Sequence, residues 1–274
     1  MKISDVRIGF VGFGHMAQVI FRAIDRSKLV PHSQILFVRR DSKKIKETEQ
    51  TFRITSTSLE NLVGTCDLIL LCVRPSQVSS ILEDMALLDL KGKMIVSILA
   101  GTKISFFQRY LGVEVEILRV MPNLPAAVGE GMTLLSYGPN SSVELKSLAH
   151  LLFGCMGEIA ELHEDLMDIG CGMSGSGPGF VFQLIEAMAR LGEKKGISYQ
   201  DSLKISAQTF LGAARLILKG GILPVHLIEQ IATPKGTTEA GFEKMRELQL
   251  EKNFQSVIEA SAARSKAISD NLNQ

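Results

Sequence analysis

The chain has 274 residues and a formal net charge of +1, from 30 basic and 29 acidic side chains. Its hydrophobic fraction of 46% and charged fraction of 22% are typical of globular proteins and exclude a disordered or collagen-like chain. The near-zero charge argues against nucleic acid or an anionic membrane as the main partner, because such partners require a large basic excess. The length allows one or two domains, at roughly 100–200 residues each.

Up to about residue 163, short apolar runs alternate with helical stretches at the spacing of βαβ units. The runs are nearly continuous, which indicates strands buried on both faces of a parallel sheet. They are Ile8–Val11, Ile35–Val38, Leu68–Val73, Ile95–Ile98 and Val113–Val120. We therefore predict an α/β protein whose N-terminal part is a Rossmann-like, doubly wound, mostly parallel sheet.

The first run leads into a G-x-G-x-x-A motif, Gly12 to Ala17, at the start of a predicted helix. Gly12 permits a tight turn, and Gly14 lets backbone N–H groups approach a pyrophosphate. A glycine turn without a ligand is the alternative, but the strand before the motif and the helix after it favour a dinucleotide site. The candidate cofactor contacts here are Val11, Gly12, Phe13, Gly14, His15 and Met16.

The second run ends in Arg39 and Arg40, where an NAD enzyme usually has an acid that holds the ribose hydroxyls. Guanidinium groups bind a 2′-phosphate through charge-assisted hydrogen bonds, so these residues favour NADPH. A solvated basic loop is the alternative, because three lysines follow, and Asp41 keeps NADH as a second candidate. Residues 1–163 are therefore predicted to form an NADP-binding domain.

Two more loops follow predicted strands at the same edge of the sheet. They are Cys72-Val73-Arg74-Pro75 and Ile98-Leu99-Ala100. Ligands of open α/β sheets lie beyond the carboxyl ends of the strands. From spacing alone, cofactor contact and ordinary loop chemistry are equally well supported here.

Residues 164–274 show only helical periodicity. The helical segments include Leu203–Leu218, which Gly220-Gly221 ends, and then Leu227–Ile231, Thr237–Leu248 and Phe254–Ile268. An all-helical domain after a doubly wound one often serves dimerisation and substrate binding, so we predict that role by analogy of fold.

The sequence offers no metal, disulfide or membrane signal. Cys66, Cys72, Cys155 and Cys171 form no C-x-x-C pair, and the five histidines are scattered. We expect reduced, buried thiols of a cytoplasmic protein. No apolar run approaches the roughly 20 residues that span a bilayer.

Several segments together resemble the pyrroline-5-carboxylate reductase family, from about Arg7 to Ile268. The pairing of S-G-S-G-P with the loop T-P-K-G-T-T-E-A-G is fairly specific, whereas the first glycine motif is generic. The segments are Gly12–Ala17, Val73–Pro75, Ser97–Gly101, Arg119–Gly131, Ser174–Pro178, Gly212–Ala214 and Thr233–Gly241.

This resemblance implies reduction of the C=N bond of Δ1-pyrroline-5-carboxylate to L-proline by hydride from a nicotinamide. It also implies a dimer through the helical domain, often assembled into larger rings, with active sites shared between subunits. Its cofactor segments match the four groups of residues above, and Ser58 stands where the family has an Asn.

The substrate residues that the resemblance implies are Gly236, Thr237 and Thr238, together with Glu164; Ser176 lies in a glycine-rich segment that allows close approach to a ring. A Gly-Thr-Thr turn that opens a helix offers N–H groups and hydroxyls to a small anion. Thr238 is the candidate catalytic residue, through a hydrogen bond to the imine nitrogen or the carboxylate. The alternatives are structural: Thr238 as a helix cap and Glu164 as an acid at a helix start.

The chain also departs from the family pattern. Lys235 replaces a glycine, which adds strain if the position needs a positive φ. Ile228, Arg246, Phe180 and Cys171 also replace the usual residues. The departures leave three alternatives open: a reductase of another cyclic imine, a β-hydroxyacid dehydrogenase-like enzyme, or a non-catalytic, cofactor-sensing paralogue.

Overall fold

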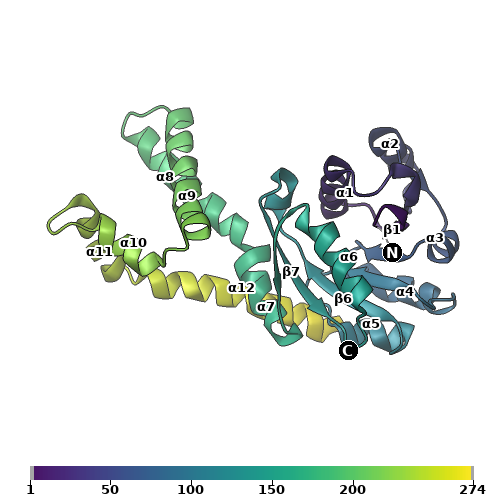
Figure 1. Ribbon diagram of the computed structural model, residues 1–274. Coiled ribbons are helices and arrows are strands. Elements are labelled where there is room, and N and C mark those ends of the chain that lie inside the picture. The colour runs from purple at the N-terminus through teal and green to yellow at the C-terminus, as the bar shows by residue number, and fades with distance from the viewer. Residues whose placement is uncertain (1–2, 273–274) are drawn as a thin grey trace. The chain divides into compact units, whose positions relative to one another are not determined.

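The computed structural model describes residues 3–272, which fall into two units. The sheet unit runs to Ser176 and resumes at Ala260, and the helical unit is Gly177–Glu259. The division differs from the predicted boundary at residue 163, because Met167 and Cys171 share a core cluster with two side chains of the sheet. Each unit is described by itself below, and its elements carry the labels of Figure 1.

Eight strands form one sheet in the order β3-β2-β1-β4-β5-β6-β7-β8. Neighbouring strands are parallel except for β6 and β7, which are antiparallel. This confirms the predicted Rossmann-like, mostly parallel sheet. The strands are β1 (Ile8–Val11), β2 (Ile35–Val38), β3 (Thr55–Ser56), β4 (Leu68–Leu71), β5 (Met94–Ser97), β6 (Glu116–Met121), β7 (Gly131–Tyr137) and β8 (Gly157–Glu161).

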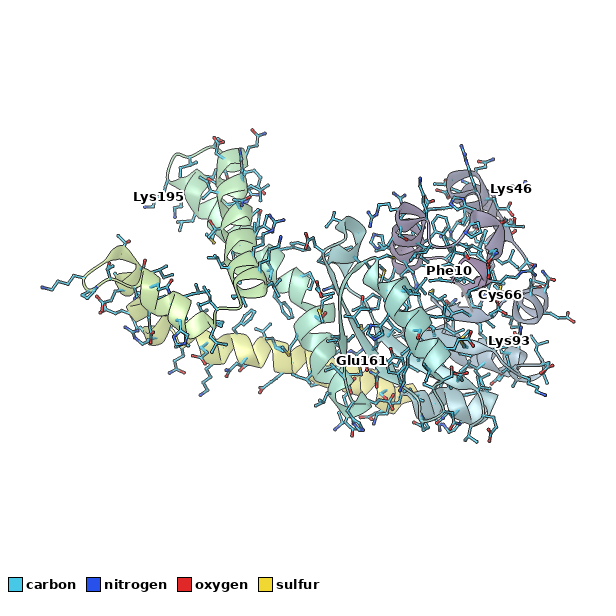
Figure 2. The ribbon with its side chains drawn as sticks, in the orientation of Figure 1. Phe10, Lys46, Cys66, Lys93, Glu161 and Lys195 are labelled. Carbon is cyan, nitrogen blue, oxygen red and sulfur yellow. The ribbon has the colours of Figure 1, made fainter. Side chains whose placement is uncertain are left out.

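Helices cover both faces of the sheet. Successive side chains of a strand point to opposite faces, so the apolar strands contribute to a core on each side. Phe10 of β1 joins a cluster with side chains of α1 and α6, whereas Val11 joins a cluster with side chains of α3, α4 and α5. Figure 2 shows Phe10 inside the layered core and Lys46 of α2 at its outer side. The helices are α1 (His15–Ser27), α2 (Ser42–Phe52), α3 (Leu59–Thr65), α4 (Pro75–Ala86), α5 (Ile104–Leu111) and α6 (Val143–Gly154).

The chain leaves the sheet through a short helical segment. α7 (Met167–Gly170) continues into a π-helical turn, Cys171–Gly175. The N–H group of Ser176 donates to the carbonyl of Cys171 at 2.9 Å, which closes this wider turn. Single π-helical turns are rare and occur often at functional sites.

The helical unit contains α8 (Gly177–Lys194), α9 (Tyr199–Gly220), α10 (Pro224–Ile231), α11 (Thr237–Glu247) and the first part of α12 (Leu250–Leu272). Gly221 ends α9 in the left-handed conformation, at the predicted stop signal. Large apolar side chains on α8 and α9, such as Phe182, Leu191 and Leu216, are exposed. Among the helices of residues 3–272, none is both long enough and apolar enough to cross a bilayer.

Candidate functional site

The turn after β1 has the backbone that the glycine motif predicts. Gly12 has φ +86°, and a Cβ atom there would lie 2.8 Å from the carbonyl oxygen of Cys72. Gly14 has open space around the position of its missing Cβ. α1 begins at His15 with no side-chain cap, so the N–H groups of its first turn are available to an anion.

A cavity of about 720 Å³ lies over this turn, at the carboxyl ends of β1, β2 and β4. Ten of the predicted cofactor contacts line it. They are Val11, Gly12, Phe13, Gly14, His15, Arg39, Arg40, Cys72, Val73 and Arg74. The glycine motif and the strand ends thus surround one cavity, and contact of these residues with a cofactor stays a prediction.

Six predicted cofactor contacts are not among the lining residues: Met16, Ser58, Pro75, Ile98, Leu99 and Ala100. The hydroxyl of Ser58 accepts a hydrogen bond from the N–H of Asn61 at 3.1 Å and caps α3. Leu99 is buried, and Ala100 packs against the cluster that contains Met167. These residues stay predictions as cofactor contacts.

Other lining residues were not predicted as cofactor contacts, notably Lys44, which was counted only in the basic loop after β2, and Gln77. Both lie in the first turn of a helix that follows a strand of the cofactor edge, α2 for Lys44 and α4 for Gln77. That position was the signal that could have identified them, because first turns face the carboxyl ends of the strands.

The basic residues after β2 have different surroundings. Arg39 is half-buried, and its Nη1 donates to the hydroxyl of Thr48 at 2.8 Å, whereas Arg40 is exposed. The carboxylate of Asp41 caps α2 by accepting the N–H groups of Lys43 and Lys44 at 3.0 and 3.2 Å. These hydrogen bonds, that from Lys44 foremost, hold the pKa of Asp41 below its usual value. The carboxylate of Asp41, the candidate for binding ribose hydroxyls, therefore already accepts hydrogen bonds from the first turn of α2.

These features fit a phosphorylated dinucleotide. Open space at Gly14 and the uncapped start of α1 suit a pyrophosphate. Arg40, Lys44 and Arg74 place positive charge around the cavity, which suits a 2′-phosphate.

We expect alanine to lower the stability of the fold at Gly12 and to weaken cofactor binding at Gly14. Gly12→Ala adds a methyl group against the Cys72 carbonyl in a left-handed backbone, which costs about 1–2 kcal/mol for the conformation alone. Its melting temperature should fall by about 2–4 °C for each kcal/mol. Gly14→Ala should keep the wild-type melting temperature but bind NADPH at least about tenfold more weakly, since its methyl group enters the open space. Fluorescence titration and thermal unfolding measure both effects. A Gly14→Ala variant with wild-type affinity would contradict a pyrophosphate at this turn.

The predicted substrate residues of the sheet unit lie in the segment after β8. Glu164 Oε1 accepts the N–H of Ile104 at 2.6 Å and lies 3.5 Å from Arg119 Nη1. The hydroxyl of Ser176 accepts a hydrogen bond from Ser261 of α12 at 2.8 Å. Glu164 thus contacts two other elements of the fold, which supports its structural reading, and Ser176 directly follows the π-helical turn.

Gly236, Thr237 and Thr238 belong to the helical unit, where Gly236 precedes the first residue of α11. The N-terminus of α11 has no side-chain cap, and Thr238 is half-buried. The first-turn N–H groups of α11 are therefore available to a small anion, and substrate binding there stays a prediction. Lys235 has φ +58°, so the position does have a positive φ, and the lysine there adds strain.

The four cysteines are free, but only Cys66 and Cys171 are buried. The expectation that all four are buried is wrong for Cys72 and Cys155, which are partly accessible and directly follow β4 and α6. Burial raises the pKa of the Cys66 thiol to about 11. Within residues 3–272, no three His, Cys, Asp or Glu side chains are arranged to hold a metal ion.

Comparisons with known proteins cover almost the whole chain. Residues 164–268 match a family model described as pyrroline-5-carboxylate reductase dimerisation, and residues 7–101 match one described as NADP oxidoreductase coenzyme F420-dependent. Pyrroline-5-carboxylate reductase 1 of Bacillus spizizenii is 32% identical over 97% of this chain and 90% of its own length. The pyrroline-5-carboxylate reductase of Arabidopsis thaliana is 32% identical over 97% and 96%. A crystal structure of the Plasmodium falciparum pyrroline carboxylate reductase with NADP bound has a TM-score of 0.88 at 27% identity, over 97% of this chain and 99% of that one.

Proposed function

The chain belongs to the pyrroline-5-carboxylate reductase family, and on this premise we propose that it reduces Δ1-pyrroline-5-carboxylate to L-proline with NADPH. The observation that carries the proposal is the cavity at the turn after β1, with its open glycine and its basic rim. The relatives at 32% identity extend over nearly the full chain, so both the cofactor unit and the helical unit have counterparts in them.

NADPH, when bound, supplies the hydride for the C=N bond. The protein binds and orients the reactants, and a protonated imine accepts a hydride without a metal or a strong acid. The N-terminus of α1 and Gly14 would hold the pyrophosphate, and Arg40 with Lys44 the 2′-phosphate. The N-terminus of α11 would hold the substrate carboxylate. The Thr238 hydroxyl would form a hydrogen bond either with this carboxylate or with the imine nitrogen.

Oxidation of NADPH in the presence of Δ1-pyrroline-5-carboxylate tests this proposal, with NADH and piperideine-6-carboxylate compared in parallel. We expect turnover with the five-membered imine and a preference for NADPH. Preferred turnover of the six-membered imine or of a β-hydroxy acid would instead indicate a shifted substrate. Cofactor binding without turnover of any of them would indicate the cofactor-sensing alternative.

We further propose that the protein forms a homodimer through its helical part and that such dimers assemble into larger rings. We also propose that it resides in the cytoplasm, where free thiols persist. Single exposed apolar residues are ordinary, but a large apolar surface on a helical unit usually marks an interface. Here α8 to α11 expose many such side chains, and among residues 177–259 few are buried. A second copy would cover them.

Light scattering at micromolar concentration is therefore expected to give at least twice the chain mass of 29.9 kDa. An isologous dimer buries the same surface of both copies, so Leu216→Glu on α9 should shift the species toward the monomer. Ser256→Ala, an exposed position of α12, serves as the control. A stable wild-type monomer would contradict both the interface and a shared active site.

A further inference from the structure

Arg119 of β6 is a buried cation with two acidic partners. Its side chain is 1% exposed, its Nη1 lies 3.5 Å from Glu164 Oε1, and its Nη2 donates to Asp168 Oδ1 at 3.2 Å. A buried guanidinium is tolerated only when its charge is paired, and removing its partners is strongly unfavourable. The positions of the Arg119, Glu164 and Asp168 side chains therefore depend on one another.

Each acid holds a further element of the sheet unit. Glu164 Oε1 accepts the N–H of Ile104, the first residue of α5, at 2.6 Å. Asp168 Oδ1 accepts the hydroxyl of Ser265, on the last turns of α12, at 2.7 Å. Through these bonds one guanidinium connects β6, the start of α5, the segment around α7 and the end of α12.

The elements that Arg119 connects flank the loop between β5 and α5, residues 98–103. Ile104, whose N–H bonds Glu164, directly follows this loop. Gly101, within it, has φ +66° and packs so closely on α12 that a Cβ atom would clash with the Ser265 carbonyl and lie 2.9 Å from Ile268 Cβ. The loop thus has two contact points: Ile104, whose N–H bonds Glu164, and Gly101, which packs on the backbone of Ser265, whose hydroxyl bonds Asp168.

The place of this loop in the sheet relates it to one end of the cofactor. The pyrophosphate turn follows β1 and the basic residues follow β2, whereas β4 and β5 lie on the other side of β1. Strands are about 4.8 Å apart, so the end of β5 is about 10 Å from the end of β1. A dinucleotide with its 2′-phosphate at β2 extends its nicotinamide toward β4 and β5.

We propose that Arg119 is a positioning residue for the nicotinamide end of the cofactor. It acts through Glu164 and Asp168, which fix the loop 98–103 at Ile104 and, by way of Ser265, at Gly101. The inference rests on the proposed function, because it requires NADPH as the cofactor. It also explains why Glu164 stands at its position even where no substrate contacts it.

The test compares NADPH with 2′-phospho-ADP-ribose, which has the same adenosine half but no nicotinamide. Dissociation constants of both ligands are measured by calorimetry for the wild type, Arg119→Met and Arg119→Lys. We expect Arg119→Met to bind NADPH at least about tenfold more weakly and the fragment as the wild type does. Arg119→Lys should restore part of the NADPH affinity, because an ammonium can still pair with one carboxylate.

Ser265→Ala keeps the proposal testable if Arg119→Met does not fold, since it removes one hydroxyl and no charge. It should weaken NADPH binding and spare the fragment, while Ser256→Ala on the same helix should change neither. Equal losses for both ligands, or no loss for either, in variants that fold would overturn the inference and leave Arg119 a purely structural residue. A wild-type chain that binds neither ligand would overturn the proposed function first.

Discussion

Replacing Arg39 by Asp together with Arg40 by Ser is expected to weaken NADPH binding far more than NADH binding. Both side chains line the cavity beyond β2, where a 2′-phosphate is predicted to lie. Each lost charge-assisted contact should cost about 1.5–3 kcal/mol, and the new carboxylate adds repulsion of the phosphate. NADH has no 2′-phosphate, so its Michaelis constant should change little.

Single variants separate cofactor contact from stability in this experiment. Arg39 donates to Thr48 of α2, so Arg39→Asp should also lower the melting temperature. Arg40 is exposed, so Arg40→Ser should raise the Michaelis constant for NADPH at an unchanged melting temperature. An unchanged Michaelis constant for NADPH in the double variant would show that neither arginine contacts the 2′-phosphate.

The fold was predictable as far as burial on both faces leaves a signal. β1, β2, β4 and β5 are short, largely apolar runs, and such runs indicate interior strands of a parallel sheet. β7 and β8 were not among the predicted runs. β8 is Gly157–Glu161, with glutamates at two of its positions, because it is an edge strand that needs few apolar side chains. The end of α12 rejoins the sheet unit, and no local pattern can predict such a distant return.

The candidate site shows the same limit. Gly12 was identifiable because its turn depends on local backbone conformation, and it has φ +86°. Gly14 was identifiable because close approach of a ligand requires a missing side chain, and the space at its Cβ position is open. Glu164 matched a family position, but its contacts with Arg119 and Ile104 come from residues far apart in the chain. Ser58 matched a family position too; it caps α3, and its contact with a cofactor stays a prediction. Contacts between residues far apart in the chain decide between a structural and a functional role, and such contacts leave no local sequence pattern.

Lys235 is the departure with the clearest physical consequence. Its φ of +58° costs a side chain about 1–2 kcal/mol relative to glycine. Glu239, in the first turn of α11, accepts the Lys235 N–H group, which offsets part of this cost. The lysine therefore leaves the helix start in place, and the turn can still present its N–H groups to a small anion.

Thr238→Ala is the second large effect that we expect, and it falls on the substrate rather than on the cofactor. The change removes one hydroxyl at the start of α11 and leaves the first-turn backbone N–H groups of Thr237 and Thr238 intact. The expected loss of transition-state stabilisation is about 1–3 kcal/mol, as for one hydrogen bond to a charged or buried group. The affinity for NADPH should hardly change, because the residues of the cofactor cavity all belong to the sheet unit.

Steady-state kinetics with Δ1-pyrroline-5-carboxylate then distinguish two roles for this hydroxyl. If Thr238 bonds the imine nitrogen, kcat should fall, whereas a hydroxyl that holds only the carboxylate should leave kcat and raise KM. Thr209→Ala is a matched control in the same unit, because its hydroxyl bonds the Ile205 carbonyl of its own helix at 2.8 Å. Wild-type values of both constants for Thr238→Ala would show that Thr238 only stabilises its helix. Loss of a hydroxyl that contacts the substrate must change kcat or KM.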